Sequence, residues 1–150
     1  MKFASVRYYD VMEEIEALGV EHYGEVGQHG MQMGIDHGTF VMMDREGKLL
    51  TIVARRDDGS LAGYMVFFVQ PFPHYRHNVR AVNDAVFLAK DCRAGRNTLR
   101  FFEFAEQMLR SMGVDQVFFS VKERNDYAPF LERLLGYTHK EVVYGKSLSV

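Results

Sequence analysis

Two arginines flank a glycine in a short basic turn, Arg93-Ala94-Gly95-Arg96-Asn97-Thr98, which follows an apolar run and leads into a helical pattern. The first backbone N–H groups of a helix lack partners within the helix, and the macrodipole adds partial positive charge there. Gly95 allows the backbone to come close to a ligand, and the guanidinium groups of Arg93 and Arg96 suit phosphate. The turn therefore predicts a phosphate or pyrophosphate site, with plain capping of the helix as the alternative.

Two better-known kinds of phosphate loop are absent from this sequence. No G-x-x-x-x-G-K-[ST] is present, and no G-x-G-x-x-G follows an apolar strand. An ATPase and a dinucleotide-dependent oxidoreductase are therefore disfavoured. A metal site is disfavoured as well, because His29 and His37 are eight residues apart with no third ligand near them, and Cys92 is the only cysteine.

The hydrophobic pattern around this turn predicts an α+β fold. An apolar strand at 80–89 precedes the turn, and apolar residues three and four apart predict a helix over 97–112 that Gly113 ends. The turn at 57–60 predicts a hairpin between strands at 49–56 and 61–70. The other expected elements are a strand at 3–9, a helix capped by Asp10 that Gly19 kinks or ends, a loop at 28–38, a short helix or strand at 39–44, a strand at 114–121, a helix capped by Asn125 or Asp126 and ended by Gly136, and a closing strand at 137–148.

Length and composition fit one globular domain spanning residues 1–150, since 47% of the 150 residues are hydrophobic. The net charge of −2 gives no broad basic field and disfavours nucleic acid as a partner. No apolar stretch approaches the ~18 residues that a membrane span needs, and residues 1–5 lead into charged sequence instead of a signal segment. With a single cysteine, these features predict a cytoplasmic protein. They leave the oligomeric state open, a homodimer included.

Residues 48–148 resemble the GNAT superfamily of N-acetyltransferases. In that family a motif of the form [QR]-x-x-G-x-[GA], between the fourth strand and the third helix, holds the pyrophosphate of acetyl-CoA. The matching positions here run from Arg93 to Thr98: the first residue agrees, whereas Arg96 and Thr98 stand where small residues are usual. The resemblance implies a GNAT-like fold, with a central mixed, mostly antiparallel sheet flanked by helices.

The chain resembles most a subgroup of GNAT proteins often carried by tailed phages, which would place it in the cytoplasm of a host cell. The matching segments keep the order of that subgroup over about two-thirds of the chain. They are Pro71/His74/Tyr75, Asp84, Arg93-Ala94-Gly95-Arg96, Leu135-Gly136-Tyr137 and Val143-Tyr144-Gly145-Lys146-Ser147-Leu148.

The resemblance implies an enzyme that transfers the acetyl group of acetyl-CoA, a co-substrate, directly to an acceptor amine on a small molecule or a protein. It implies that backbone groups of Phe87, Leu88 and Ala89 bind the pantetheine arm of the cofactor. The pyrophosphate would be held by five residues of the basic turn: Arg93, Gly95, Arg96, Asn97 and Thr98.

Acetyl transfer also needs a base for the amine and an acid for the thiolate. We expect Asp84 to be the base, unless it merely pairs with Arg80; His74 and His77 are the competitors, because imidazole titrates near neutrality. The family's usual acid is a tyrosine, but Glu132 occupies that position here. Tyr75, water or Tyr127 could then protonate the thiolate, although Tyr127 could equally be a core residue. Three residues in a polar stretch would line the acceptor side and hold a cationic substrate, or else form a solvated helix face: Glu21, His22 and Glu25.

Two other functions remain open at this point. The chain could be a catalytically weak acyl-CoA-binding or protein-interaction module on the same fold, which the unusual residues Arg96, Thr98 and Glu132 favour. It could also bind single-stranded nucleic acid through arginines interleaved with Tyr75, which the near-neutral charge disfavours. The arginines concerned are Arg76, Arg80, Arg93, Arg96 and Arg100.

Overall fold

The computed structural model describes residues 1–27 and 31–148 and shows an α+β fold in which these residues form one five-stranded sheet. The strands lie in the order β1-β2-β3-β4-β5, antiparallel except for the parallel pair β4 and β5. The predicted fold class, a mixed and mostly antiparallel sheet flanked by helices, is confirmed. The strands are β1 (Lys2–Val6), β2 (Leu49–Arg55), β3 (Leu61–Pro71), β4 (Val79–Leu88) and β5 (Gln116–Phe118).

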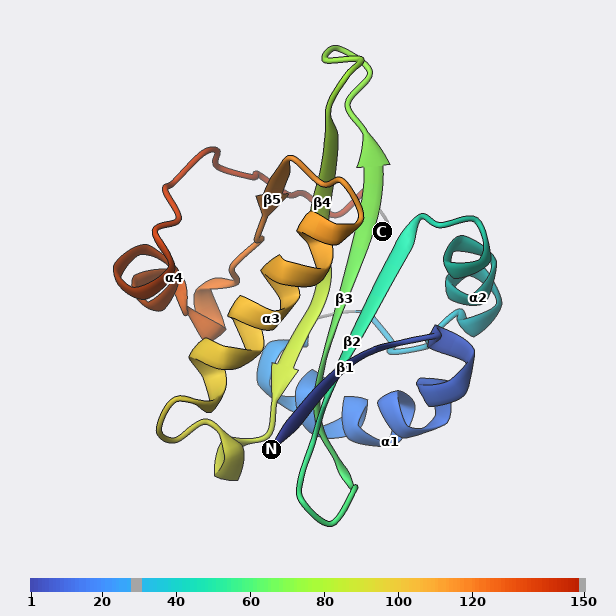
Figure 1. The fold of residues 1–150 in the computed structure, drawn as a ribbon, viewed down its shortest axis with the longest axis vertical. Coiled ribbons are helices and arrows are strands. Elements are labelled where there is room, and N and C mark those ends of the chain that lie inside the picture. The colour runs from blue at the N-terminus through green and yellow to red at the C-terminus, as the bar shows by residue number, and fades with distance from the viewer. Residues whose placement is uncertain (28–30, 149–150) are drawn as a thin grey trace.

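Helices cover both faces of the sheet (Figure 1). On one face lie α1 (Tyr8–Val26) and α2 (His37–Arg45), and on the other lie α3 (Asn97–Ser111) and α4 (Ala128–Leu135). Each face has its own hydrophobic core, one joined by α1 and the other by α3 and α4. Among the described helices, none combines the length and apolar character that crossing a membrane requires.

The central strands β2 and β3 are buried on both faces of the sheet. Successive side chains of a strand point to opposite faces, so Ile52 and Met65 join the core under α3 while Val53 and Tyr64 join the core under α1. This double burial explains why the sequence of β3 is an almost continuous apolar run. The central strand predicted at 61–70 is confirmed.

Two features of β4 prepare the candidate site. Its parallel pairing with β5 covers only Arg80 to Val82, so among the described residues no strand accompanies that edge of β4 beyond Val82. Its register against β3 shifts between Asn83 and Ala85, which leaves Asp84 as a bulged residue with none opposite it. A bulge bends its strand and re-aims side chains.

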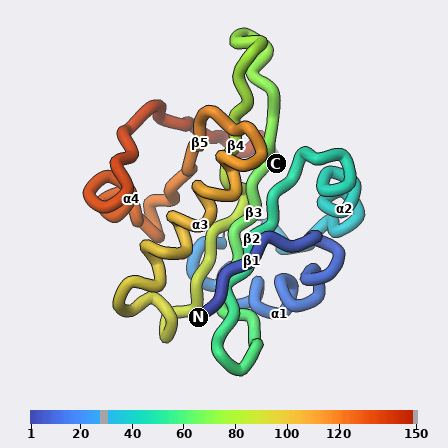
Figure 2. The backbone as a smooth tube through the Cα atoms, viewed as in Figure 1, coloured from blue at the N-terminus to red at the C-terminus, as the bar shows by residue number. Residues whose placement is uncertain are grey.

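The two ends of β4 lie at opposite ends of the molecule (Figure 2). The turn between β3 and β4, residues 72–78, projects from one end, and residues 89–96 lead into α3 near the other. The ten residues of β4 span roughly 33 Å at the usual rise of a strand. Side chains of the turn at 72–78 are therefore remote from the basic turn.

Three predicted boundaries near the N-terminus are wrong. The strand predicted at 3–9 ends at Val6, because Tyr8 is the buried first residue of α1. Asp10 is not the N-cap but lies in the first turn of α1, where a carboxylate still favours the positive end of the helix. Gly19 does not end α1, which continues to Val26, because beyond that glycine His22 stacks on Phe87 of the sheet and Glu25 pairs with Arg93.

The stretch before β2 is helical. The segment predicted as a short helix or strand at 39–44 belongs to α2, which begins after Asp36; that carboxylate accepts a hydrogen bond from the backbone N–H of Thr39 (3.1 Å). Of the loop predicted at 28–38, residues 31–36 have no regular structure. Residues 28–30, His29 among them, lie outside the described residues.

The closing strand predicted at 137–148 is wrong. Its residues form no strand, and the side chains of Val143 and Tyr144 are 78% and 92% exposed. A lone segment gains little from extended structure without a neighbour to pair with. The strand predicted at 114–121 is reduced to β5, whereas Gly136 ends α4 as predicted, in a left-handed conformation with φ of 72°.

Candidate active site

The basic turn is an ordered connection between β4 and α3. After β4 the chain makes one short 3-10 turn, η1 (Lys90–Cys92), and Gly95 adopts φ of +67°, which an L-residue with a side chain rarely adopts. The side chains of Asn97 and Thr98 donate hydrogen bonds back to the carbonyls of Cys92 and Arg93, both at 3.2 Å. Neither side chain accepts a hydrogen bond from the helix.

The first backbone N–H groups of α3 have no side-chain cap. The N-cap is Arg96, whose side chain contains donors only, and no other described residue accepts a hydrogen bond from these N–H groups. Three consecutive N–H groups, those of Asn97, Thr98 and Leu99, are thus left to solvent or to a ligand. The alternative that the turn merely caps its helix is not what the structure shows.

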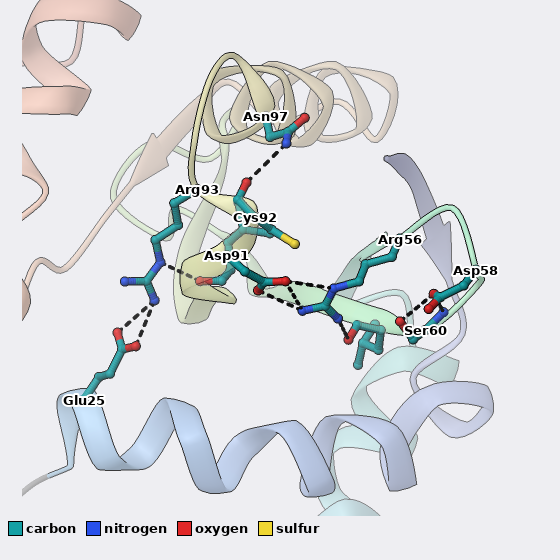
Figure 3. Close-up of polar contacts among 10 residues, drawn as sticks. Glu25, Arg56, Asp58, Ser60, Asp91, Cys92, Arg93 and Asn97 are labelled. Atoms are coloured by element: carbon teal, nitrogen blue, oxygen red, sulfur yellow. Dashed lines mark hydrogen bonds and ion pairs between the residues drawn. The ribbon is translucent and has the colours of Figure 1, made fainter.

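The two arginines of the turn have different surroundings. Nη2 of Arg93 donates to both carboxylate oxygens of Glu25 in α1, at 3.0 and 2.9 Å, and Nε donates to the carbonyl of Leu88 at 2.6 Å (Figure 3). Its guanidinium also lies 5.5 Å from the ring centre of Phe87. Arg96 is exposed and forms no ion pair with a described residue. Arg93 therefore ties α1 to the end of β4, and Arg96 is the arginine available to a ligand.

A second ion pair holds the turn from its other side. Arg56, which directly follows β2, donates through Nη2 to both carboxylate oxygens of Asp91, at 2.9 and 3.1 Å, and through Nη1 to the carbonyl of Leu61 at 3.1 Å (Figure 3). The middle of η1 is thereby fixed to the β2–β3 hairpin. A helix N-terminus fixed from two sides is preorganised for a ligand.

The open edge of β4 offers backbone groups beside the turn. Ala89 donates its N–H to the carbonyl of Ala62 (2.8 Å), and backbone groups alternate in direction along an antiparallel strand, so Phe87 and Ala89 face β3. Val86 and Leu88 therefore face the edge that β5 has left. Of the three residues expected to bind a pantetheine arm through the backbone, only Leu88 faces this edge. The other residue that faces it is Val86, which sequence reasoning missed.

Asp84 stands at the mouth of a pocket of about 270 Å³ between α1, the segment before α2, and strands β3 and β4. Its side chain forms no hydrogen bond or ion pair with a described residue, and Arg80 instead donates to Gln70 (3.4 Å). The expected alternative, a pair between Asp84 and Arg80, is thus absent among the described residues. Although Asp84 is exposed at the mouth, desolvation by the pocket walls raises the pKa of its carboxyl, against the opposing charge of Lys122.

A histidine–tyrosine pair lies deeper in the pocket. Nδ1 of His22 is 2.7 Å from the hydroxyl of Tyr64, and the imidazole stacks on Phe87 with ring centres 4.9 Å apart. Burial lowers the pKa of His22 to about 4, so its ring is neutral near pH 7. Burial, followed by the charge of Asp84, raises the pKa of Tyr8 to about 12. Sequence reasoning missed Tyr8 and Tyr64, because each stands in a stretch that its pattern assigns to the core.

The other predicted acceptor-side residues do not join Asp84. Glu25 is bound to Arg93, and Glu21 is exposed without an ion pair to a described residue. His74, His77 and Tyr75 lie exposed in the turn at 72–78, beyond the start of β4. Asp84 lies five residues beyond the start of β4, roughly 17 Å along the strand, and these three residues precede that start.

The candidate acids lie outside the pocket as well. Tyr127 packs against Phe102 in the core under α3, with ring centres 6.1 Å apart, and burial raises the pKa of its hydroxyl to about 12. Glu132 is exposed on α4. No group of three His, Cys, Asp or Glu side chains within residues 1–27 and 31–148 is arranged to hold a metal ion.

Solved structures share this fold over nearly the whole chain. A ribosomal-protein-alanine N-acetyltransferase from Brucella melitensis biovar Abortus is 14% identical, with a TM-score of 0.71, covering 99% of this chain and 100% of that one. An acetyltransferase from Trypanosoma brucei is 17% identical, with a TM-score of 0.70, covering 98% and 99%. An aminoglycoside acetyltransferase from an uncultured soil sample is 13% identical, with a TM-score of 0.75, covering 99% and 95%.

These likenesses show that the chain has the fold of these acetyltransferases, as the resemblance to the GNAT superfamily implied, and they give no support to the phage subgroup. No model of a protein family matches the sequence, and no curated protein does. The chemistry of the site must therefore be argued from the geometry of its own residues.

Proposed function

We propose that this protein is an acetyl-CoA-dependent N-acetyltransferase that transfers the acetyl group directly to an acceptor amine. The observation that carries the proposal is the meeting of three features along one end of β4. These are the uncapped N-terminus of α3 with Arg96 beside it, the open edge at Val86 and Leu88, and the bulged carboxylate of Asp84 facing a pocket.

The residues present fit acetyl-CoA. Its diphosphate would accept hydrogen bonds from the free N–H groups of Asn97, Thr98 and Leu99, with the charge of Arg96 opposite it. Its pantetheine arm carries amides, which would pair with the backbone groups of Val86 and the N–H of Leu88 as a neighbouring strand would, since Arg93 already donates to the carbonyl of Leu88. When bound, it would supply a thioester whose carbonyl accepts the amine.

Asp84 is our candidate for the general base. Its carboxylate would accept a proton from the ammonium form of the acceptor, directly or through water, and the free amine would attack the thioester carbon as the C–S bond breaks. A raised pKa makes this carboxylate a stronger base than an exposed aspartate. The core position of Tyr127 and the exposure of Glu132 lead us to assign the proton taken up by the thiolate to water.

The acceptor that we propose is an amine on a protein or on a small molecule. Two of the similar structures carry names that specify a ribosomal-protein alanine and an aminoglycoside as acceptors, so both protein amino groups and small-molecule amines are candidates here. We further propose that the protein acts in the cytoplasm as a single domain.

A second candidate function is a catalytically weak acyl-CoA-binding module. The pair between Arg93 and Glu25 favours it, because this pair occupies one of the two arginines expected to bind phosphate. Calorimetry with acetyl-CoA, followed by an assay of thiol release over a panel of amines, separates the two functions. Binding with amine-dependent thiol release supports the transferase; binding without release from any amine supports the module; absence of binding refutes both.

A further inference from the structure

We infer that the acceptor is a primary monoamine with an apolar body, and not a polyamine or an aminosugar. The inference rests on the proposed function, since it names the class of amine that the same site would take. It is argued from the walls, the charges and the glycine of the pocket at Asp84.

The walls of the pocket are largely apolar. They come from α1, the segment before α2, and strand β3, and they offer a body of hydrocarbon the contacts that stabilise it in water by burial. The apolar side chains involved are Ile15, Val26, Met33, Ile35, Phe40 and Val66. A phenyl ring is accommodated in an apolar cavity of about 150 Å³, so a volume of about 270 Å³ has room for a ring and a short alkyl arm.

The pocket provides one unpaired carboxylate. Of its two described acidic residues, Asp36 is already used, since it accepts hydrogen bonds from the N–H of Thr39 (3.1 Å) and from its hydroxyl (2.6 Å). Asp84 is the other, and its side chain has no hydrogen-bond partner among the described residues. Asp84 is thus the carboxylate free to pair with one ammonium group, whereas a second ammonium group of a polyamine would meet either Asp36, whose two oxygens are engaged by Thr39, or an apolar wall.

The polar side chains deeper in the pocket already use part of their hydrogen-bonding capacity within the protein. Nδ1 of His22 is bonded to Tyr64, and the hydroxyl of Tyr8 is 2.9 Å from Nδ1 of His37. An aminosugar carries more hydroxyl groups than these side chains can still serve, so several would lose water without gaining partners, which is costly for a buried polar group. This disfavours an aminosugar even though a similar fold is found in an aminoglycoside acetyltransferase.

Gly19 opens the pocket from the side of α1. It is buried in the middle of a helix, where glycine is normally unfavourable, and a Cβ there would lie 3.3 Å from Cε of Met33 and 3.7 Å from the hydroxyl of Tyr64. Gly24 lies in the same helix, is exposed, and would place a Cβ in open space. A side chain at Gly19 would therefore push Met33, itself a wall residue, into the space that an apolar body would occupy.

The test compares kcat/KM for 2-phenylethylamine, spermidine and kanamycin with acetyl-CoA in the full-length protein. We expect 2-phenylethylamine to be preferred at least tenfold over either polycation. Gly19→Ala should lower kcat/KM for 2-phenylethylamine at least fivefold and leave that for methylamine within twofold. The matched Gly24→Ala should change neither value by more than twofold.

Preference for spermidine or kanamycin would overturn the inference while leaving the proposed transferase reaction intact. An unchanged kcat/KM for 2-phenylethylamine in Gly19→Ala would do the same. Direct binding of 2-phenylethylamine, followed by NMR shifts of the methyl groups of Met33 and Ile15, keeps the inference testable without turnover. Binding that Gly19→Ala weakens, in a protein that acetylates no amine, would support the pocket assignment and refute the proposed reaction. Absence of both binding and preference would overturn the inference.

Discussion

Glu25→Gln separates two roles for Arg93, a tie within the fold and a ligand for the cofactor. The substitution preserves shape and leaves one oxygen to accept from Arg93, but it removes the charge that the guanidinium faces. In the native pair the side chain of Glu25 is 15% exposed and that of Arg93 is 36% exposed. The pair is therefore neither a surface salt bridge nor a fully buried one.

The expected loss of stability follows from that intermediate position. Breaking a buried ion pair costs about 3–5 kcal/mol, and an exposed pair contributes about 0–1 kcal/mol. With Arg93 still bonded to the carbonyl of Leu88, we expect Glu25→Gln to lower the free energy of unfolding by about 1–2 kcal/mol. For a chain of this length that corresponds to a fall in Tm of roughly 3–6 °C.

Urea denaturation and calorimetry with CoA measure the two roles side by side. If Arg93 is a tie, Glu25→Gln is less stable and its Kd for CoA stays within about twofold of the native value. Glu21→Gln is the matched control in the same helix, because Glu21 is exposed and forms no ion pair with a described residue; it should change stability by less than about 0.5 kcal/mol. CoA binding tightened fivefold or more would refute this reasoning, since it would mean that Glu25 competes with the diphosphate for Arg93.

Three further results are expected. Asp84→Asn should lower kcat by about 10²–10⁴-fold with an unchanged Kd for CoA, and full activity in steady-state assays would assign the base to another residue. The same substitution should stabilise the fold more at pH 7 than at pH 3, because a carboxyl whose pKa is raised in the folded state contributes stability while protonated and loses that contribution as pH rises. Arg96→Gln should raise the Kd for CoA about fivefold to tenfold in low salt with Tm unchanged, whereas an unaltered Kd in calorimetry would count against the free N-terminus of α3 as the diphosphate site. Burial lowers the pKa of His22 from 6.5 to about 4, so between these pH values the folded protein binds fewer protons at His22 than the unfolded chain does. The free energy of unfolding should therefore fall by up to roughly 3 kcal/mol as pH drops from about 6.5 to about 4. If urea titrations of His22→Phe showed the same dependence on pH as the native protein, this explanation would be wrong.

The sequence predicts best where a single local pattern is decisive. The helix at 97–112, the hairpin around 57–60 and the central strand at 61–70 all form close to the predicted residues. In each case hydrophobic period and turn chemistry agree, so tertiary contacts have nothing to override. The basic turn was identifiable for the same reason, since glycine, arginine and a helix start stand together in the chain.

Partners that come from distant segments could not be read from the sequence. Arg93 and Arg96 look alike in the chain, and only the arrival of Glu25 from α1, 68 residues earlier, assigns them different surroundings. Tyr64 reads as a core residue of an apolar strand until His22 is placed against its hydroxyl. The segment at 137–148 has the composition of a strand, but strand formation depends on a partner edge, which no local pattern specifies.

Three positions break local rules, and they lie around the half of β4 that leads into α3. A glycine occupies the buried middle of a helix at Gly19, a carboxylate without a partner occupies a strand at Asp84, and an arginine without a capping oxygen precedes a helix at Arg96. Gly19 and Arg96 are each less favourable for folding than other residues at those positions, and desolvation disfavours the charged form of Asp84. A purely structural account needs a separate reason for each of them. A bound amine and a bound diphosphate account for all three together. Residues that are unfavourable for folding are expected to cluster at a functional site, where binding or catalysis requires them.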